Sequence, residues 1–484
     1  MPPISNTPRL PVQHKKGDIL ESLRVENMAA EGKCLTRING MVLFITGGAP
    51  GDTVDVELTK VKTAFLEGRV IRTRSFSPSR SEPFCSHFGT CGGCSWQHIR
   101  YDIQLQYKQQ QVVDHLERIG GLDLPPIMPI LSARQVQHYR NRLDFTFTAN
   151  RWLTSNEMAE GKSFDAPGLG YHMPRMYDKV FDVSECFLQA DPSNNIRSMV
   201  REIALKHSIP FFDLRKQIGF LRTLTIRTAI TGEVMVILQV TYDQMEWIEL
   251  ILSALASSFP SINSLIYAIN GKRNDTFAGL EMVCWKGYPY ITERMQRPEG
   301  NGSLEFRVGP KSFYQTNSLQ AERLYYSAWE MAELKGDELV YDLYTGAGTI
   351  ANYIAKSARE VIGLEYVADA IDDARVNSQL NKVTNTRFFV GDIAKLLDGG
   401  FIAQYGRPDV VITDPPRAGM HKDVCRVLLE AAPRRIVYVS CNPATQARDL
   451  KILSEKYTIT ALQPVDMFPQ TVHVENVAKL ERKD

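Results

Sequence analysis

From Gly309 onward, short apolar runs alternate with segments of helical spacing. The apolar runs are 338–344, 360–366, 386–392, 408–416 and 435–441, and the helical segments are 317–334, 349–358, 368–381 and 422–432. Nearly continuous apolar strands that alternate with helices are typical of a parallel sheet covered on both faces. The pattern therefore predicts a doubly wound, Rossmann-like α/β domain over residues 309–484.

Two earlier regions have different patterns. Residues 15–76 alternate apolar and polar positions in short runs broken by Gly-rich turns, which is typical of a small closed β-barrel of the OB-like kind. Residues 77–308 mix strands with helices and predict a central α+β domain. Its predicted strands are 141–150, 223–230, 233–242 and 264–270, and its predicted helices are 101–120, 193–208 and 245–259. Residues 1–14 are predicted to form a disordered tail.

Composition adds limits to this picture. The chain is 44% hydrophobic and 23% charged, as in ordinary globular proteins. It has no apolar run of the roughly 20 residues that a membrane span needs and no signal-like apolar segment near Met1, so we expect a cytoplasmic protein with no membrane partner. With a net charge of +1, a nucleic-acid partner would have to meet local basic patches. One candidate patch lies on the barrel, although a merely solvated face fits the charges equally well: Lys60, Lys62, Arg69, Arg72 and Arg74.

Three cysteines lie in one glycine-rich loop with the spacing Cys85-x5-Cys91-x2-Cys94. Cys186 is the best candidate for a fourth ligand. Zinc and iron–sulfur clusters both accept four thiolates. Because zinc sites more often use two C-x2-C pairs and only one is present, the spacing favours iron–sulfur. Three other cysteines are expected in the core: Cys34, Cys284 and Cys425.

A nucleotide site is indicated by the sequence Gly346-x-Gly348-x-x-Ala between a predicted strand and a predicted helix. Glu365, Asp392 and Asp414 end the next three strands, and a carboxylate at the Glu365 position can bind both hydroxyls of a ribose. Asp414 begins a rigid Asp-Pro-Pro loop, which is typical of S-adenosylmethionine enzymes that act on nucleobases or amides. The sequence therefore predicts a methyl-donor site at this edge.

Seven segments together carry a resemblance: CSHFGTCGGCSWQH, YRNRLDFTF, FYQTN, DLYTGAG, DPPRAGM, YVSCNPATQARDL and MFPQTVHVE. They resemble the iron–sulfur, TRAM-domain branch of the RNA uracil-C5-methyltransferase family, whose members make 5-methyluridine in 23S rRNA. The resemblance covers nearly the whole chain. It implies an RNA-binding TRAM barrel, S-adenosyl-L-methionine as donor, a monomer, and a [4Fe–4S] cluster on Cys85, Cys91, Cys94 and Cys186. Relatives that act on tRNA generally lack the barrel and the cluster, which favours rRNA.

The resemblance also assigns residues to the donor and to the RNA. Gln315 matches a donor-binding position, and Tyr344, Glu365 and Asp414 match donor-contacting or uracil-contacting positions. The remaining donor candidates are Gly346, Gly348, Thr349, which stands where many relatives carry Asn, and Asp392, which stands at a variable position. The RNA candidates are Phe313, which would stack on the flipped base, Asp414, which would hold the uracil edge, and Arg140 and Arg142, which would contact phosphates.

The chemistry expected of such an enzyme needs a nucleophile and a base. Uracil C5 becomes nucleophilic when a thiolate adds to C6, and the C5 proton must be removed after methyl transfer. Cys441, at the tip of a predicted strand, is the nucleophile candidate. Glu475 matches the base of the family, and His473 lies near it in sequence.

The sequence has three alternative interpretations. The first is the same chemistry on a tRNA uridine. The second is a non-catalytic RNA-binding assembly factor, against which the presence of both Cys441 and Glu475 argues. The third is a radical methyl-transfer enzyme. Those enzymes typically carry C-x3-C-x2-C and leave one iron without a cysteine ligand, whereas this chain has C-x5-C-x2-C and a candidate for the fourth ligand.

Overall fold

The computed structural model describes residues 14–29, 32–162, 166–174 and 176–484. The predicted tail, apart from His14, lies outside the described residues. The described chain forms two compact units. The first contains the residues up to Phe84 together with Ser95–Tyr107 and Gln470–Val472, and the second contains Cys85–Cys94, Lys108–Pro469 and His473–Asp484. The domain boundaries at 76 and 308 stay predictions.

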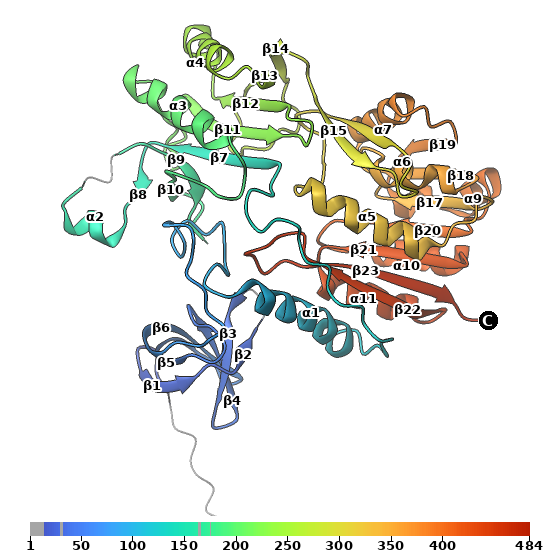
Figure 1. The fold of residues 1–484 in the computed structure, drawn as a ribbon, viewed down its shortest axis with the longest axis horizontal. Coiled ribbons are helices and arrows are strands. Elements are labelled where there is room, and N and C mark those ends of the chain that lie inside the picture. Colours follow the sequence, from blue (N-terminus) through green and yellow to red (C-terminus); the bar gives the residue numbers. More distant parts are fainter. Residues whose placement is uncertain (1–13, 30–31, 163–165, 175) are drawn as a thin grey trace, which may run out of the picture. The chain divides into compact units, whose positions relative to one another are not determined.

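The first unit is built on a six-stranded sheet with the order β1-β5-β6-β4-β3-β2 (Figure 1, blue). Its strands are β1 (Ile19–Arg24), β2 (Asn27–Met28), β3 (Cys34–Ile38), β4 (Met41–Thr46), β5 (Thr53–Val61) and β6 (Phe65–Ser75). The long strand β6 pairs antiparallel with β5 and parallel with β4, which brings both halves of the sheet together. Alternate side chains, among them Leu43, Val54 and Val56, form a buried core. The alternating pattern of the sequence thus marks the inner face of this sheet.

The second unit contains an eight-stranded sheet with the order β14-β13-β12-β11-β7-β9-β10-β8. Its strands are β7 (Arg142–Thr148), β8 (Arg151–Trp152), β9 (Gly168–His172), β10 (Val180–Asp182), β11 (Leu221–Thr228), β12 (Val234–Val240), β13 (Ile262–Ile269) and β14 (Val283–Gly287). The helices of this part are α2 (Ser155–Ala159), α3 (Ser193–Lys206) and α4 (Met245–Ser258), and α1 (Tyr101–Arg118) precedes them. The predicted central strands and helices are confirmed, with ends that differ by a few residues.

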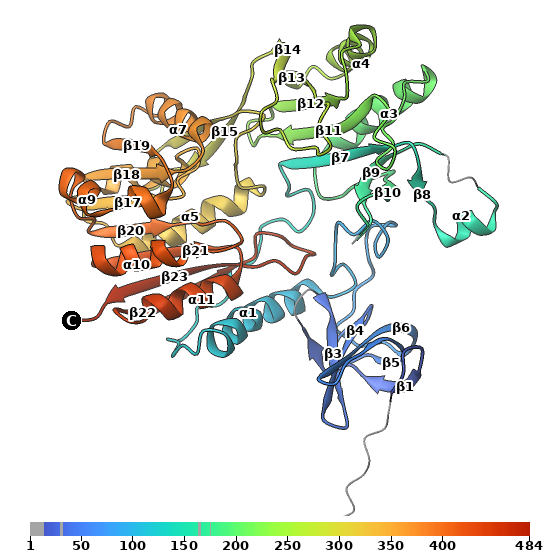
Figure 2. The same cartoon turned by 180° about the vertical axis from the view of Figure 1, so that it is seen from behind.

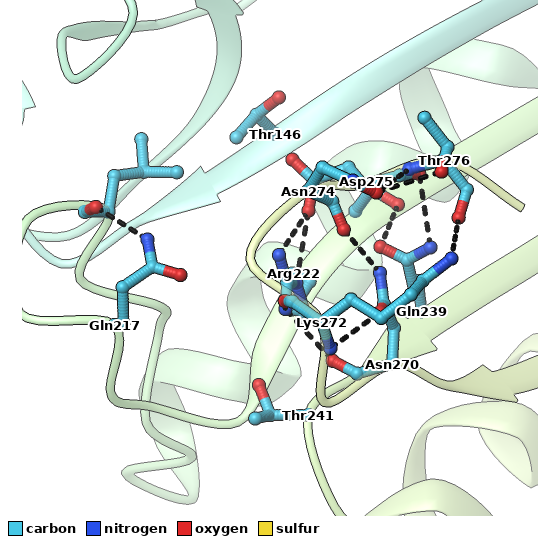
Figure 3. A network of polar contacts seen from close by, with 12 residues as sticks. Thr146, Gln217, Arg222, Gln239, Thr241, Asn270, Lys272, Asn274, Asp275 and Thr276 are labelled. Carbon is cyan, nitrogen blue, oxygen red and sulfur yellow. Dashed lines mark hydrogen bonds and ion pairs between the residues drawn. The ribbon is translucent and has the colours of Figure 1, made fainter.

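The loop that follows β13 is fixed by a buried arginine (Figure 3). The Arg222 side chain is 2% exposed, forms an ion pair with Asp275 at 2.7 Å and donates to the carbonyl oxygen of Asn270 at 2.8 Å. Lys272 donates to the carbonyl oxygens of Thr276 and Ala278. A buried guanidinium is tolerated only when its donors are satisfied, so this network fixes the conformation of the loop before β14.

A two-stranded hairpin, β15 (Ile291–Gln296) with β16 (Ser303–Val308), leads to a seven-stranded sheet with the order β19-β18-β17-β20-β21-β23-β22. The strands are β17 (Leu339–Leu343), β18 (Glu360–Glu365), β19 (Thr386–Val390), β20 (Val410–Thr413), β21 (Arg435–Ser440), β22 (Tyr457–Val465) and β23 (Glu475–Arg482). The helices are α5 (Ser318–Ala332), α6 (Thr349–Ile354), α7 (Ala368–Leu380), α8 (Ile393–Leu396), α9 (Gly399–Tyr405), α10 (Lys422–Ala431) and α11 (Pro443–Leu453), with a 3-10 turn, η2 (Ala355–Ser357), after α6.

Both faces of this sheet are buried, as Figures 1 and 2 show by the helices around it. Val340 packs in one core cluster and its neighbour Tyr341 in another, and the same division separates Val437 from Tyr438. The predicted doubly wound α/β fold is confirmed. The expectation of a purely parallel sheet needs one correction, because β23 pairs antiparallel with both β21 and β22. No helix among the described residues is long and apolar enough to cross a membrane.

Candidate active site

Five polar side chains gather at one edge of the seven-stranded sheet because each lies at a strand end. Glu365 is the last residue of β18, Asp392 follows β19, Asp414 follows β20 and Cys441 follows β21. Glu475 begins the antiparallel strand β23. Since β17 to β21 are parallel and β23 runs the opposite way, all five lie at the carboxyl edge, where ligands bind in such folds.

Cys441 and Glu475 are brought together by strand register. Ser440, the last residue of β21, pairs with Asn476 of β23. Cys441 follows Ser440 and therefore lies opposite Glu475, the first residue of β23. Burial raises the pKa of the half-buried Cys441 thiol to about 12, and the carboxyls of Glu475 and Asp414 add to this. The effect of the Glu475 carboxyl on the thiol pKa agrees with the register in placing the two side chains near each other.

The Cys441 strand ends in a helix cap. The Asn442 side chain accepts a hydrogen bond from Ala444 N at 3.1 Å, and Pro443 occupies the first turn of α11, where it needs no amide partner. The strand therefore stops directly after the thiol. This cap explains why Cys441 lies at the tip of the strand, as the sequence predicted.

Glu475 is buried without a cation at hydrogen-bonding distance. Glu475 is 2% exposed, and its Oε2 accepts no hydrogen bond from the described residues. Burial and the nearby Asp414 carboxyl raise its pKa well above the usual value, while Arg417 lowers it. A carboxyl that is costly to ionise in place is suited to accept a proton from a bound ligand.

Asp414 is held by the segment that contains Gln315. The Gln315 amide donates to Asp414 Oδ2 at 3.4 Å, and burial raises the Asp414 pKa to about 7. Asn141, from the YRNRLDFTF motif, donates to the carbonyl oxygen of Gln315 at 2.9 Å and to Ser318 Oγ at 2.8 Å. This motif therefore has a structural contact with the FYQTN segment that the sequence did not indicate.

Arg417 is a functional candidate that the sequence reasoning missed. Its carbonyl oxygen accepts hydrogen bonds from Asn442 Nδ2 at 3.1 Å and from Thr445 Oγ1 at 3.2 Å, which ties the Asp-Pro-Pro loop to the end of β21. Its exposed guanidinium lowers the pKa values of both Cys441 and Glu475. The signal was its place directly after Asp-Pro-Pro.

The glycine turn after β17 has the backbone that a close ligand approach needs. Tyr344, Gly346 and Gly348 all have positive φ angles, of 63°, 52° and 74°. A Cβ on Gly348 would lie 2.9 Å from the Cβ of Ala374, so only glycine fits there. The Glu365 carboxylate accepts hydrogen bonds from Gly346 N at 3.2 Å and from Val367 N, and this fixes its position beside the turn.

The other donor candidates have local roles in the structure. Thr349 is the first residue of α6 and is buried. Asp392 caps α8 by accepting from Ala394 N at 3.1 Å, and Lys395 lies 3.8 Å from its carboxylate. Their contact with a donor stays a prediction.

The RNA candidates differ in exposure. Phe313 is 67% exposed, as a stacking residue must be. Arg142 forms an ion pair with Asp144 at 3.0 Å, and the half-buried Arg140 lies over the ring of Phe468 at 5.5 Å. Neither arginine projects freely, so their predicted phosphate contacts stay predictions.

The four cysteines of the predicted cluster lie in the second unit. Cys186 belongs to the core of the eight-stranded sheet, and Cys91 and Cys94 pack against that same core. The Tyr171 hydroxyl donates to Cys186 Sγ at 3.4 Å. Among the described residues, however, no group of three or more His, Cys, Asp or Glu side chains is arranged to hold a metal ion. Cys91, Cys94 and Cys186 therefore pack on the same core, but the described side chains do not form a metal-coordinating group.

Comparisons with known proteins find two family models and several relatives. Residues 286–483 match the family model described as tRNA (Uracil-5-)-methyltransferase, and residues 21–71 match that of the TRAM domain. A Bacteroides thetaiotaomicron protein described as an uncharacterized RNA methyltransferase is 51% identical over 94% of this chain and 100% of its own length. A Porphyromonas gingivalis protein with the same description is 52% identical over 95% of this chain and 99% of its own length.

A solved structure is similar over nearly the whole chain. The Pyrococcus abyssi tRNA (uracil-54, C5)-methyltransferase in complex with S-adenosyl-L-homocysteine superposes with a TM-score of 0.71 and 29% identity. The match covers 95% of this chain and 100% of the archaeal one. The similarity therefore includes both the barrel and the sheet that carries Cys441.

Proposed function

Because this chain belongs to the family of S-adenosylmethionine-dependent RNA uracil-C5 methyltransferases, we propose that it methylates C5 of a uridine through a covalent adduct on Cys441. The observation that carries the proposal is the β21–β23 register, which puts Cys441 opposite Glu475 at the edge that also holds Asp414. The glycine turn and Glu365 would hold the donor. When bound, the donor supplies an electrophilic methyl group on a sulfonium.

In the first step, the Cys441 sulfur forms a bond to C6 of the uracil, and the electron pair of the C5–C6 double bond moves toward C4 and its oxygen. The thiol must first lose its proton, which its pKa of about 12 resists. Arg417 stabilises the thiolate because its positive charge lowers that pKa. Asp414 holds the uracil edge, with Gln315 fixing the carboxyl from behind.

In the second step, the electron pair of the enolate forms a bond from C5 to the methyl carbon as the bond from that carbon to the donor sulfur breaks. C5 becomes tetrahedral, and the donor would leave as a neutral thioether. Glu475 then removes the C5 proton, and the electron pair of that C–H bond restores the C5–C6 double bond as the bond from C6 to the Cys441 sulfur breaks. The raised pKa of Glu475 matches it to this carbon acid. The non-catalytic alternative is set aside, because an assembly factor would need neither group.

The direct test measures methyl transfer by the Cys441→Ala variant. The matched control is Cys284→Ala, which removes a half-buried cysteine outside the site. Cys441→Ala should lose turnover by a factor on the order of 10⁴ or more and should form no adduct with 5-fluorouridine RNA. Cys284→Ala should behave as the wild type. Turnover retained in Cys441→Ala would remove the covalent step.

We propose 23S rRNA as the target, on the motif resemblance. The barrel does not distinguish rRNA from tRNA, because the similarity to the archaeal tRNA enzyme includes it. The similarity to the archaeal tRNA enzyme supports a tRNA uridine as the second candidate. Mapping 5-methyluridine in rRNA and tRNA from cells that lack this gene separates the two, since only the true target loses its modification.

The [4Fe–4S] cluster is also a proposal, supported by the four cysteines and the shared packing of three of them on one core. No reaction step is assigned to it. Anaerobically purified protein should contain about four irons and four sulfides per chain and lose them in Cys91→Ser. Stoichiometric zinc would contradict the cluster. A monomer and a cytoplasmic location stay predictions, to be checked by mass in solution and by cell fractionation.

A further inference from the structure

The exposed Tyr288 and the half-buried Tyr290 lie beside the active-site segment and have no role in the proposed chemistry. Tyr288 is 63% exposed and stacks on Tyr290, with ring centroids 5.6 Å apart and an interplanar angle of 27°. The Arg307 guanidinium lies over the Tyr290 ring at 4.5 Å. We call Tyr288, Tyr290 and Arg307 the aromatic ledge.

The ledge is next to the segment that contains Phe313. Ile291 pairs with Val308, so the residues before β15 and the residues after β16 leave the hairpin at the same end. A Cβ on Gly309 would lie 3.7 Å from the carbonyl oxygen of Pro289, which lies between the two tyrosines. The chain continues from Gly309 to the exposed Phe313 and then to Gln315 at the catalytic edge.

The backbone of the ledge is fixed at Tyr288, whose N donates to the carbonyl oxygen of Asn263 at 3.1 Å. The segment that follows the ledge is fixed as well. The buried Arg227 donates to the carbonyl oxygen of Gly309 at 2.6 Å and to that of Ser312 at 3.0 Å. The Ser312 hydroxyl donates to Asp373 at 2.5 Å. An exposed ring on a fixed backbone loses little conformational freedom when a planar ligand stacks on it.

The charges around the ledge favour a polyanion. Lys286 and Lys311 are exposed on either side of it in sequence, and Arg307 is exposed within it. In the part of the chain that the structure describes, no carboxylate lies within ion-pair distance of these three cations. Stacked rings beside unpaired cations are the combination that binds single-stranded nucleic acid, in which bases are free to stack and phosphates lie close to them.

We propose that the aromatic ledge stacks an unpaired RNA base close to the target uridine, while Lys286 and Lys311 contact the flanking phosphates. The inference rests on the proposed function for its substrate and adds a second stacking position to that of Phe313. Its occupant is a single-stranded nucleotide, because the bases of a duplex are already stacked on each other.

The test measures binding of a fluorescein-labelled, mixed-sequence, single-stranded RNA of about 12 nucleotides to the full-length protein by anisotropy. Tyr288→Ala should weaken binding about tenfold, since stacking on one ring contributes on that order. Tyr288→Phe keeps the ring and should bind as the wild type. Tyr177→Ala removes another tyrosine, which is 77% exposed, and should change nothing.

Unchanged binding by Tyr288→Ala would overturn the ledge, and so would an equal loss in Tyr288→Phe, since the ring would then not be the cause. Methylation assays of the same variants separate this failure from failure of the proposed function. With wild-type turnover present, the KM for RNA should rise in Tyr288→Ala while the KM for the donor stays the same, and an unchanged KM for RNA overturns the ledge. If the wild type methylates no RNA but the binding loss persists, the ledge stands and the proposed function fails.

Discussion

The carboxylates of the six-stranded barrel and those of the catalytic edge are the same chemical groups in opposite surroundings. In the barrel, burial alone would raise the Asp52 pKa, but hydrogen bonds from Arg80, Ser77 and Ala49 lower it. Hydrogen bonds from Lys33 and Lys60 likewise lower the pKa of Glu67. At the catalytic edge, burial raises the pKa values of Asp414 and Glu475, and Arg417 is the cation that acts on Glu475.

The difference in pKa distinguishes carboxylates that stabilise the fold from carboxyls that can act on a ligand. A carboxylate that already has its cation stabilises the fold and has little left to offer a ligand. A buried carboxyl that has no ion pair is costly to ionise, because burial disfavours its charged form, and it therefore takes up a proton readily. The following experiments test this contrast, beginning with the largest expected effect.

Glu475→Gln removes the proton acceptor while keeping the shape of the side chain. Turnover should fall about 10²- to 10⁴-fold, because general-base catalysis contributes that much, and the Cys441–RNA adduct should accumulate. The adduct is measured as a denaturation-resistant band. Glu481→Gln, at the other end of β23 and ion-paired with Arg435 at 2.8 Å, is the matched control and should keep full activity. An unchanged rate in Glu475→Gln would require another base.

Arg80→Ala leaves Asp52 buried without its cation, since the pair lies at 2.7 Å and the Asp52 side chain is 0% exposed. The free energy of unfolding of the barrel should fall by about 3 kcal/mol at neutral pH. Because the folded pKa of Asp52 is lowered, this difference should be full above about pH 4 and disappear as the pH falls through the folded pKa. Denaturant titrations at several pH values measure it, and a loss independent of pH would assign the effect to packing.

Asp414→Asn should shift the pH dependence of the remaining activity. Glu475 works deprotonated, so kcat/KM rises as the pH rises through its pKa. Asp414 raises that pKa, and removing its charge should move the rise to lower pH. A pH–rate profile of both proteins is the measurement. A shift to higher pH would mean that the profile reports another group.

The smallest effect is expected on the barrel surface. Lys60 pairs with Glu67 at 3.2 Å, whereas Lys62 is exposed and has no ion pair among the described residues. Lys62→Ala should therefore lower the slope of log affinity against log salt for RNA by about one, and Lys60→Ala by less. Equal slopes for both variants would show that ion pairing does not decide which lysines contact phosphates.

Much of the catalytic edge could be predicted because parallel strands bring their carboxyl ends to one side. The placement of Glu365, Asp414 and Cys441 follows from strand order alone. The antiparallel insertion of β23 could not be predicted, since the strand is buried on both faces and its side chains show no period that distinguishes direction. The contact of Asn141 with Gln315 depends on tertiary packing between segments far apart in sequence.

Basic residues show the same limit. The spacing of Lys60, Arg69 and Arg74 suggested a free positive face, but each is ion-paired in the barrel. Their partners lie on other strands, so the pairing depends on sheet register, which charge patterns along one strand do not contain. All five basic residues of that set are exposed, and Lys62 and Arg72 are the two that form no ion pair among the described residues.

The insertion of β23 between β21 and β22 also orders the assembly of the enzyme during translation. The glycine turn, Glu365, Asp414 and Cys441 leave the ribosome in that order, and they can take their places on the growing sheet. Glu475 comes after all of them and cannot pair until β22 has been made. A nascent chain that has been made only as far as Cys441 therefore carries the proposed nucleophile without the proposed base. If both roles hold, an RNA captured at that stage could not be released as product.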